Sequence, residues 1–141
     1  MIILDTNIIS EPDKPAPDAV VLAWLNRQHR PLLYLTIPTI AELTFGGHRL
    51  FIRSGSAKFL ERVRQILEVE FVGRILPFDL LSTDAYGLVR AKRERAGRQI
   101  SQIDGMIAAI CLVHGATLAT RNVRDFDGLD LKLVNPFEAG A

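Results

Sequence analysis

Short apolar segments alternate with helical segments along the whole of this 141-residue chain. Each apolar segment is short and is followed by turn-forming residues or by a helix start, which is typical of a strand buried on both faces. We expect such strands at residues 1–4, 32–37, 74–78, 117–120 and 131–134. Strands that alternate with helices predict a parallel sheet covered by helices on both faces and joined by right-handed connections.

The helical segments carry recognisable start and stop signals. We expect helices at residues 19–28, 38–45, 57–71, 82–96 and 102–114. Asp18 is a suitable N-cap for the first of them, and Gly46–Gly47 should end the second. Ser82 or Thr83 should cap the fourth, and Gly97 should stop it. The third should bury a stripe formed by Phe59, Leu60, Val63, Ile66 and Leu67. No second-domain boundary or repeat appears, so we expect one domain over residues 1–141.

The last of these helices is apolar on every face, yet it carries a carboxylate in its first turn. Eight apolar residues follow one another from Met106 to Val113, a pattern that predicts a buried helix. Ser101 and Asp104 have the spacing of a capping box, and a carboxylate is favoured at the positive end of a helix. Capping alone would therefore explain Asp104, taken as a single residue.

Four acidic residues are expected at one edge of the sheet. The helices that connect parallel strands run antiparallel to them, so helix N-termini and the carboxyl ends of strands share an edge. The residues that follow a strand or open a helix at this edge are Asp5, Glu42, Asp104 and Asp125. Each alone could be a turn, cap or surface residue, but three of them lie in apolar sequence surroundings.

Four carboxylates at one edge would need a proton or a cation. Two carboxylates about 4 Å apart repel by on the order of 4 kcal/mol at an effective dielectric constant near 20. Oxygen donors without histidine or cysteine favour a hard ion, Mg²⁺ or Mn²⁺, over zinc. The acidic edge therefore predicts a site for such an ion.

The composition also bears on which partners and which cellular location we expect for the protein. The formal net charge is +1, so contact with nucleic acid would need a local basic patch. Cys111 is the only cysteine and forms no internal disulfide, which fits a small buried side chain. The N-terminal segment lacks the features of a signal peptide, and no segment approaches the ~20 apolar residues of a membrane span. We expect a soluble, cytoplasmic protein with no membrane partner.

The residues around these acids resemble those of the PIN-domain nucleases, and within them the VapC/FitB-type toxins of bacterial toxin–antitoxin pairs. The segments that carry the resemblance are ILDTNIIS at residues 3–10, TIAEL at 39–43, ISQIDGMIAAI at 100–110 and HGATLATRNVRDF at 114–126. The resemblance covers essentially the whole chain. It implies a three-layer α/β/α sandwich around a mainly parallel sheet.

The resemblance also implies roles for individual residues. The catalytic and metal-binding residues would be Asp5, Glu42, Asp104 and Asp125, and their polar supports would be Thr6, Asn7, Thr120 and Asn122. One departure is visible around the helical aspartate. Gln102–Ile103 stands where the family pattern has a proline–aromatic or proline–X pair before it, and Gly105 stands where the pattern has alanine after it. A glycine there lowers helix stability by up to about 1 kcal/mol relative to alanine, but it leaves the carboxylate in place.

The activity implied by the resemblance is the Mg²⁺-dependent hydrolysis of RNA phosphodiester bonds by an endoribonuclease. Asp5 and Asp104 would bind the ion directly, while Glu42 and Asp125 would act through water or orient the nucleophile. One ion or two would both suit this set. The partners implied are a second copy of the chain and a cognate antitoxin, with DNA contacted only indirectly through the antitoxin.

An RNA substrate also requires positive charge near the acids. The segment RAKRERAGR supplies five basic residues, which are Arg90, Lys92, Arg93, Arg95 and Arg98. The helix that contains them directly precedes Asp104, so its basic end should lie near the acidic edge and contact phosphates. A solvated helix face, or a contact with an acidic antitoxin segment, would explain the same cluster.

Two other functions fit parts of the sequence. Haloacid-dehalogenase-like phosphatases also place an aspartate after their first strand, but they need a second aspartate two residues later, where this chain has Asn7. A catalytically silent PIN scaffold would work through antitoxin binding and DNA-linked regulation. Such a scaffold has no use for four mutually repelling acids, so we favour the nuclease.

Overall fold

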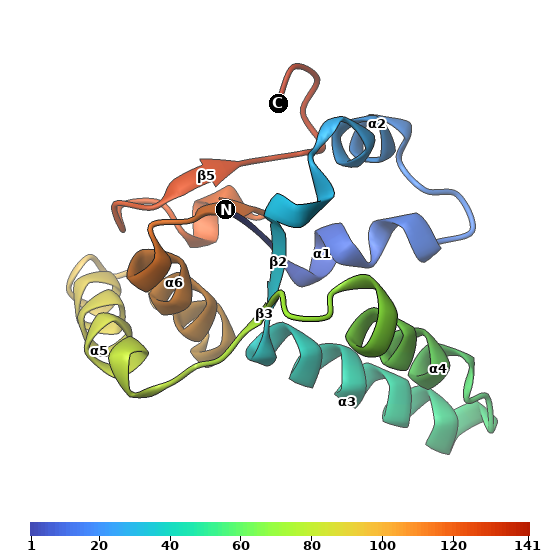
Figure 1. Ribbon diagram of the computed structural model, residues 1–141. Coiled ribbons are helices and arrows are strands. Elements are labelled where there is room, and N and C mark those ends of the chain that lie inside the picture. Colours follow the sequence, from blue (N-terminus) through green and yellow to red (C-terminus); the bar gives the residue numbers. More distant parts are fainter.

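A computed structural model describes all 141 residues and shows a five-stranded parallel sheet between two layers of helices (Figure 1). The strands are β1 (Ile2–Leu4), β2 (Leu33–Thr36), β3 (Ile75–Leu76), β4 (Thr117–Ala119) and β5 (Lys132–Val134). Their order in the sheet is β3-β2-β1-β4-β5, and every neighbouring pair is parallel. The predicted α/β fold and all five predicted strands are confirmed, and each strand is slightly shorter than expected.

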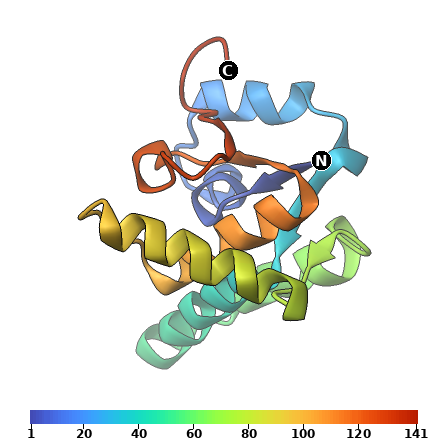
Figure 2. The same ribbon diagram turned by 90° about the vertical axis from the view of Figure 1, so that its left-hand side faces the viewer.

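The helices cover both faces of this sheet. They are α1 (Thr6–Ile9), α2 (Ala19–Arg27), α3 (Ile37–Ser54), α4 (Lys58–Gln65), α5 (Leu80–Arg95) and α6 (Gln102–His114). Short turns of other helix types are η1 (Glu11–Asp13), η2 (Arg30–Leu32), η3 (Ile66–Glu70) and η4 (Val123–Asp125). Figures 1 and 2 show α5 and α6 packed together on one face, while α1 and α2 lie on the other. None of the helices combines the length and the apolar character that crossing a membrane would require.

The hydrophobic core is divided in two by the sheet. Successive side chains of a strand point to opposite faces, so Leu4 packs in one cluster with Val21 and Trp24, whereas Ile3 packs in the other with Val89 and Ile107. Each of these side chains is buried. The two clusters account for the apolar runs of the strands, which have no solvent-facing side.

The helix α3 does not end at Gly46–Gly47, so that prediction is wrong. It continues to Ser54 and ends at Gly55, whose positive φ of 74° suits a helix terminus. The second of the two glycines instead allows α4 to pack closely against α3. A Cβ atom built at Gly47 would lie 2.6 Å from Cδ2 of Leu60. The glycine signal in the sequence therefore marks helix packing and not a helix end.

The N-cap of helix α5 lies three residues before Ser82, the earlier of the two predicted caps. Its N-cap is Asp79, whose carboxylate accepts hydrogen bonds from the backbone N and the hydroxyl of Ser82 at 3.3 and 3.2 Å. The first turn contains two exposed leucines, Leu80 and Leu81. Because they are apolar but not buried, the hydrophobic pattern of the sequence does not indicate that the helix begins here. The predicted stop is confirmed, since Gly97 follows the helix with φ of 72°.

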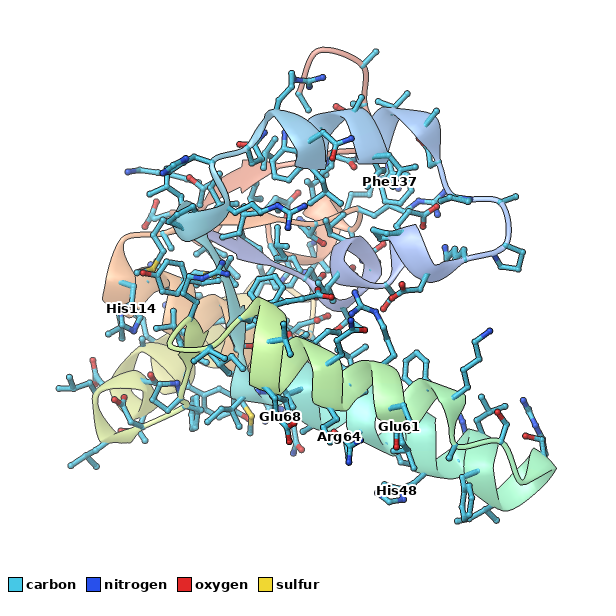
Figure 3. All side chains as sticks on the ribbon, turned by 45° about the vertical axis from the view of Figure 1, so that its right-hand side comes forward. His48, Glu61, Arg64, Glu68, His114 and Phe137 are labelled. Carbon is cyan, nitrogen blue, oxygen red and sulfur yellow. The ribbon has the colours of Figure 1, made fainter.

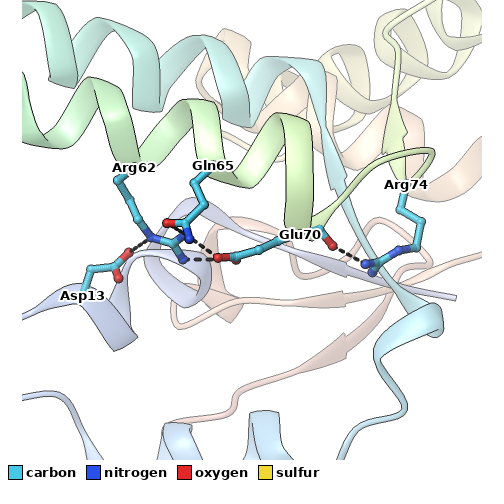
Figure 4. Close-up of polar contacts among 5 residues, drawn as sticks. All are labelled: Asp13, Arg62, Gln65, Glu70 and Arg74. Carbon is cyan, nitrogen blue, oxygen red and sulfur yellow. Dashed lines mark hydrogen bonds and ion pairs between the residues drawn. The ribbon is translucent and has the colours of Figure 1, made fainter.

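The segment predicted as one helix over residues 57–71 changes its geometry half-way. Regular α4 ends at Gln65, and η3 continues it as a π-helical turn. Arg62 links this region to η1, since it donates hydrogen bonds to Asp13 at 2.8 Å and to Glu70 at 2.6 Å (Figure 4). The change of geometry also turns Leu67 outward, so its predicted place on the buried stripe is wrong.

Candidate active site

Asp5 lies at the carboxyl end of β1 and is buried, with 5% of its surface exposed. Its Oδ1 atom accepts a hydrogen bond from the backbone N of Thr6 at 2.8 Å. Its Oδ2 atom accepts hydrogen bonds from the Thr120 hydroxyl at 2.7 Å and from the Asn7 amide at 3.5 Å. The backbone N of Asp5 donates to the carbonyl of Ala119 at 2.9 Å. The carboxylate is therefore held in one orientation between β1 and β4.

The charge on Asp5 is nevertheless disfavoured. Burial raises its pKa, and the hydrogen bonds from Thr120 and Thr6 offset only part of this effect. The negative charge of Asp125 raises the pKa of Asp5 further. A carboxylate in this position gains from any cation that approaches the open end of β1.

Asp104 is the third residue of α6 and is half-buried. The predicted start of the helix is confirmed, because the Ser101 hydroxyl accepts a hydrogen bond from the backbone N of Asp104 at 3.1 Å. Burial raises the pKa of Asp104, and the charges of Asp5 and Asp125 raise it further. The first turn of α6 thus brings its carboxylate within electrostatic reach of Asp5.

Glu42 reaches the same edge from the second turn of α3. Its side chain is exposed, although its neighbours in the sequence are apolar. Partial desolvation raises the pKa of Glu42, and so do the charges of Asp5 and Asp104, while the Thr6 hydroxyl lowers it. That hydroxyl oxygen is itself buried and makes no hydrogen bond of ordinary length and angle.

Asp125 is exposed in η4, the short turn that follows β4. Asp125 acts electrostatically on two of the other acids, since its negative charge raises the pKa of both Asp5 and Asp104. The loop before it is anchored by the backbone N of Asn122, which donates to the Thr120 hydroxyl oxygen at 3.0 Å. The four acids come from four separate segments and influence one another at one edge of the sheet.

The polar residues expected to support the acids act in three different ways. Thr120 uses its side chain, and Asn7 uses both ends of its amide, because its Oδ1 atom also accepts from the backbone N of Arg121 at 3.2 Å. Thr6 and Asn122 contribute backbone N–H groups, to Asp5 and Thr120 respectively. Two of the four supports therefore depend on backbone position and not on the side chain named.

The donor set suits a hard divalent cation in its chemistry, but the side chains are not arranged as a finished ligand shell. All four donors are carboxylates, and the Thr6 hydroxyl adds a buried oxygen without a partner. No three histidine, cysteine, aspartate or glutamate side chains are gathered closely enough to hold a metal ion as they stand. Because the charge of Asp5 raises the pKa of Asp104 and Glu42, and the charge of Asp125 raises that of Asp5, a cation held by these carboxylates would relieve their repulsion.

The five basic residues expected near the acids do not form one uniform patch. Arg93 is 6% exposed and donates hydrogen bonds to the carbonyls of Arg98 and Asp127, so its expected contact with phosphate is corrected to a structural role. Arg98 pairs with Asp127 at 2.7 Å, and Lys92 lies 3.7 Å from an exposed aspartate. The two that pair with no acid are Arg90 and Arg95.

Tyr86 is a residue near this edge that sequence reasoning assigned to the core or an interface and did not place at the site. Its ring packs against Gly105, the residue after Asp104, and its hydroxyl accepts a hydrogen bond from Arg90 at 3.1 Å. The signal that could have found it is the unusual glycine itself, which indicates that something lies close to that turn.

Known proteins resemble the chain over nearly its whole length. The model of the PIN domain family matches residues 2–131, a range that contains all four acids. The plasmid stability protein StbB of Pseudomonas syringae pv. tomato is 40% identical, over 99% of this chain and 100% of that protein. The VapC ribonuclease Y4jK of Sinorhizobium fredii is 39% identical, over 98% and 99%.

A solved structure shows the same arrangement in three dimensions. In the structure of FitAB bound to an IR36 DNA fragment, a chain that is 38% identical superposes with a TM-score of 0.90. The superposition covers 100% of this chain and 99% of that one. The parallel sheet and its helical layers are thus shared by the two proteins from end to end.

Proposed function

The chain belongs to the PIN-domain family, with the toxin FitB of Neisseria gonorrhoeae and the VapC ribonuclease Y4jK among its relatives, and we propose that it is a metal-dependent endoribonuclease. We further propose that it acts as the toxin of a toxin–antitoxin pair. The observation that carries the nuclease proposal is the gathering of four acids from separate segments at one edge, where the charge of Asp5 raises the pKa of Asp104 and Glu42 and the charge of Asp125 raises that of Asp5.

This repulsion favours an enzyme over a scaffold. Like charges held together lower the stability of the folded chain, and such arrangements persist where function uses them. A divalent cation between these carboxylates would convert the repulsion into binding energy. A scaffold that only holds a partner would gain nothing from it.

The four acids fall into two pairs with different roles in the proposed reaction. Asp5 and Asp104 would hold the ion directly, since the first is fixed by hydrogen bonds and the second by a helix. Glu42 and Asp125 are exposed and would bind through water or orient the attacking water. When bound, such an ion, Mg²⁺ with Mn²⁺ as the alternative, would lower the pKa of a water molecule and stabilise charge on the phosphate oxygens.

The remaining parts of the proposal concern the substrate, the binding partners and the oligomeric state of the chain. RNA phosphates would contact the exposed basic residues of α5 and of the loop after it, with Arg93 excluded. The resemblance to the FitB chain of a FitAB complex supports a cognate antitoxin as the partner of this chain, with DNA reached only through that antitoxin. We also propose a homodimer that works in the cytoplasm, as one domain over its whole length.

A nuclease assay tests the proposal directly. The purified chain, freed of any partner, is incubated with labelled RNA in Mg²⁺, in chelator, and as the variant Asp5→Asn. We expect cleavage only by the unaltered chain with Mg²⁺. Glu68→Gln is the matched control, because Glu68 is an exposed acid on η3 (Figure 3), outside the four segments that carry the candidate acids, and its loss should leave cleavage unchanged.

Two outcomes would contradict the proposal. Cleavage that survives Asp5→Asn would come from a contaminating nuclease. An absence of any cleavage, together with normal binding of the antitoxin, would favour the silent scaffold.

A further inference from the structure

Tyr86 packs directly against the first turn of the helix that carries Asp104. A Cβ atom built at Gly105 would lie 3.1 Å from Cε2 and 3.4 Å from Cδ2 of the Tyr86 ring. The ring also meets Phe78 edge-on, with 5.5 Å between ring centroids and an interplanar angle of 78°. Tyr86 is half-buried and packs against both Phe78 and the first turn of α6.

The same tyrosine holds Arg90. The two residues are four positions apart on α5 and so share a face of the helix. A guanidinium nitrogen of Arg90 donates a hydrogen bond to the Tyr86 hydroxyl at 3.1 Å, and the guanidinium carbon lies 5.7 Å from the ring centroid. The Cγ atom of Arg90 would lie 3.6 Å from a Cβ atom at Gly105, so the stem of Arg90 also packs beside that glycine.

Arg90 differs from the other basic residues of this region. Arg93 is buried, and Lys92 and Arg98 each have an acidic partner. Arg95 is exposed, but no hydrogen bond or ion pair holds its side chain. Arg90 is exposed, has no carboxylate partner and is held in place beside the turn that carries Asp104.

We propose that Arg90 contacts a phosphate of the RNA next to the acidic edge, and that Tyr86 is the residue that positions it. A guanidinium binds phosphate oxygens through a planar pair of N–H donors. Holding that group before the RNA arrives reduces the side-chain entropy lost on binding. This inference rests on the proposed function, because it assigns one contact of the same substrate.

The proposal also explains why residue 105 is glycine. An alanine there would bring its Cβ within 3.1 Å of Tyr86, so the ring and the arginine it holds would have to shift. Glycine lets α5 approach the first turn of α6 and brings Arg90 with it. The loss of helix propensity at Gly105 accompanies this close approach.

RNA binding as a function of salt tests the proposal. All variants are made with Asp5→Asn so that the RNA stays intact, and the dissociation constant of a short single-stranded RNA is measured by fluorescence anisotropy from 50 to 200 mM salt. Arg90→Gln should weaken binding roughly three- to tenfold and reduce the salt slope by about 0.7, the value for one phosphate contact on a single strand. Arg90→Lys should restore the slope but only part of the affinity.

Tyr86→Phe separates positioning from packing. It keeps the ring on Gly105 and removes the hydroxyl that holds Arg90. We expect weaker binding with an unchanged slope, because the charge of Arg90 remains. In the catalytically active chain the same variant should raise KM more than it lowers kcat. Arg64→Gln, on exposed α4 (Figure 3), is the control and should change neither quantity.

Three results would overturn the proposal. One is a slope for Arg90→Gln that equals that of Arg64→Gln, and another is a slope that falls only in Arg95→Gln. The third is an RNA affinity of Tyr86→Phe equal to that of the chain with Tyr86, which would show that Tyr86 does not position Arg90. All three leave the nuclease proposal intact if Mg²⁺-dependent cleavage is seen, whereas an absence of such cleavage overturns the proposed function and this inference with it. The melting temperature of each variant is measured as a control, to check that the variant is folded.

Discussion

The hydroxyl of Thr120 donates a 2.7 Å hydrogen bond to Oδ2 of Asp5, and it joins the ends of β4 and β1 across 115 positions of the chain. Both residues are buried. The same hydroxyl oxygen accepts from the backbone N of Asn122, at the start of the loop that carries Asp125. One side chain therefore orients the first acid and anchors the segment of the fourth.

Replacing Thr120 with valine should weaken metal binding. Valine has nearly the same shape but removes the shortest hydrogen bond to the Asp5 carboxylate. Losing a partner that orients a metal ligand typically weakens metal binding about ten- to a hundredfold. Isothermal titration with Mn²⁺ would measure the change in affinity. Thr83→Val, which removes an exposed hydroxyl on α5, is the control, and equal affinities for the two variants would contradict the role of Thr120.

Divalent ions should stabilise the folded chain. An ion that binds only the folded state raises the free energy of unfolding by about 2.7 kcal/mol at a hundred times its dissociation constant. We therefore expect the melting temperature to rise with Mg²⁺ or Mn²⁺ in the unaltered chain and in Glu68→Gln. In Asp5→Asn and Asp104→Asn the rise should be lost or much smaller. Equal rises in all four proteins would place the ion elsewhere.

The metal-free chain should show the repulsion of its acids in the pH dependence of stability. The ordinary pKa of an aspartate is 3.8, and burial and neighbouring charges raise the pKa of Asp104 above it in the folded chain. A group with a raised pKa holds its proton more tightly when folded, so its contribution to stability falls as the pH rises through that interval. Asp104→Asn removes this contribution.

The free energy of unfolding of Asp104→Asn minus that of the unaltered chain should therefore increase from pH 4 to pH 7. Denaturant unfolding in the presence of chelator would measure it. A difference is needed because other acids act in the opposite direction: Arg98 lowers the pKa of Asp127, which favours folding as the pH rises. A difference that stays constant with pH would show that folding does not raise the pKa of Asp104.

The two adjacent glycines of α3 should respond oppositely to alanine. At Gly47 a Cβ atom would meet Leu60 at 2.6 Å, so Gly47→Ala should lower the free energy of unfolding by about 1–3 kcal/mol. At Gly46 the nearest atom is 3.8 Å away in Phe59, an ordinary contact. Gly46→Ala should therefore be neutral, or stabilise the helix by up to about 1 kcal/mol. Urea unfolding of both variants tests the pair, and a similar loss in each would contradict close packing as the reason for Gly47.

Several features of the site were accessible from the sequence because they depend on neighbours along the chain. The apolar run before Asp5 predicts a strand that ends there, and Ser101 predicts the helix start that presents Asp104. The parallel topology then places both at one edge. Glu42 lies in the second turn of α3, and its side chain is exposed because its apolar neighbours on the helix lie on other faces.

What the sequence by itself determined is the succession of strands and helices, and with it the edge at which the acids emerge. Periodicity, capping residues and turn residues act over a few positions, so they can be read without knowing what packs opposite. Only the tertiary structure decided that α3 continues through Gly46–Gly47, that Arg93 is buried against Asp127, and that Tyr86 lies on Gly105. Each of these depends on a contact between segments far apart in the chain, and local sequence does not specify which surfaces will meet.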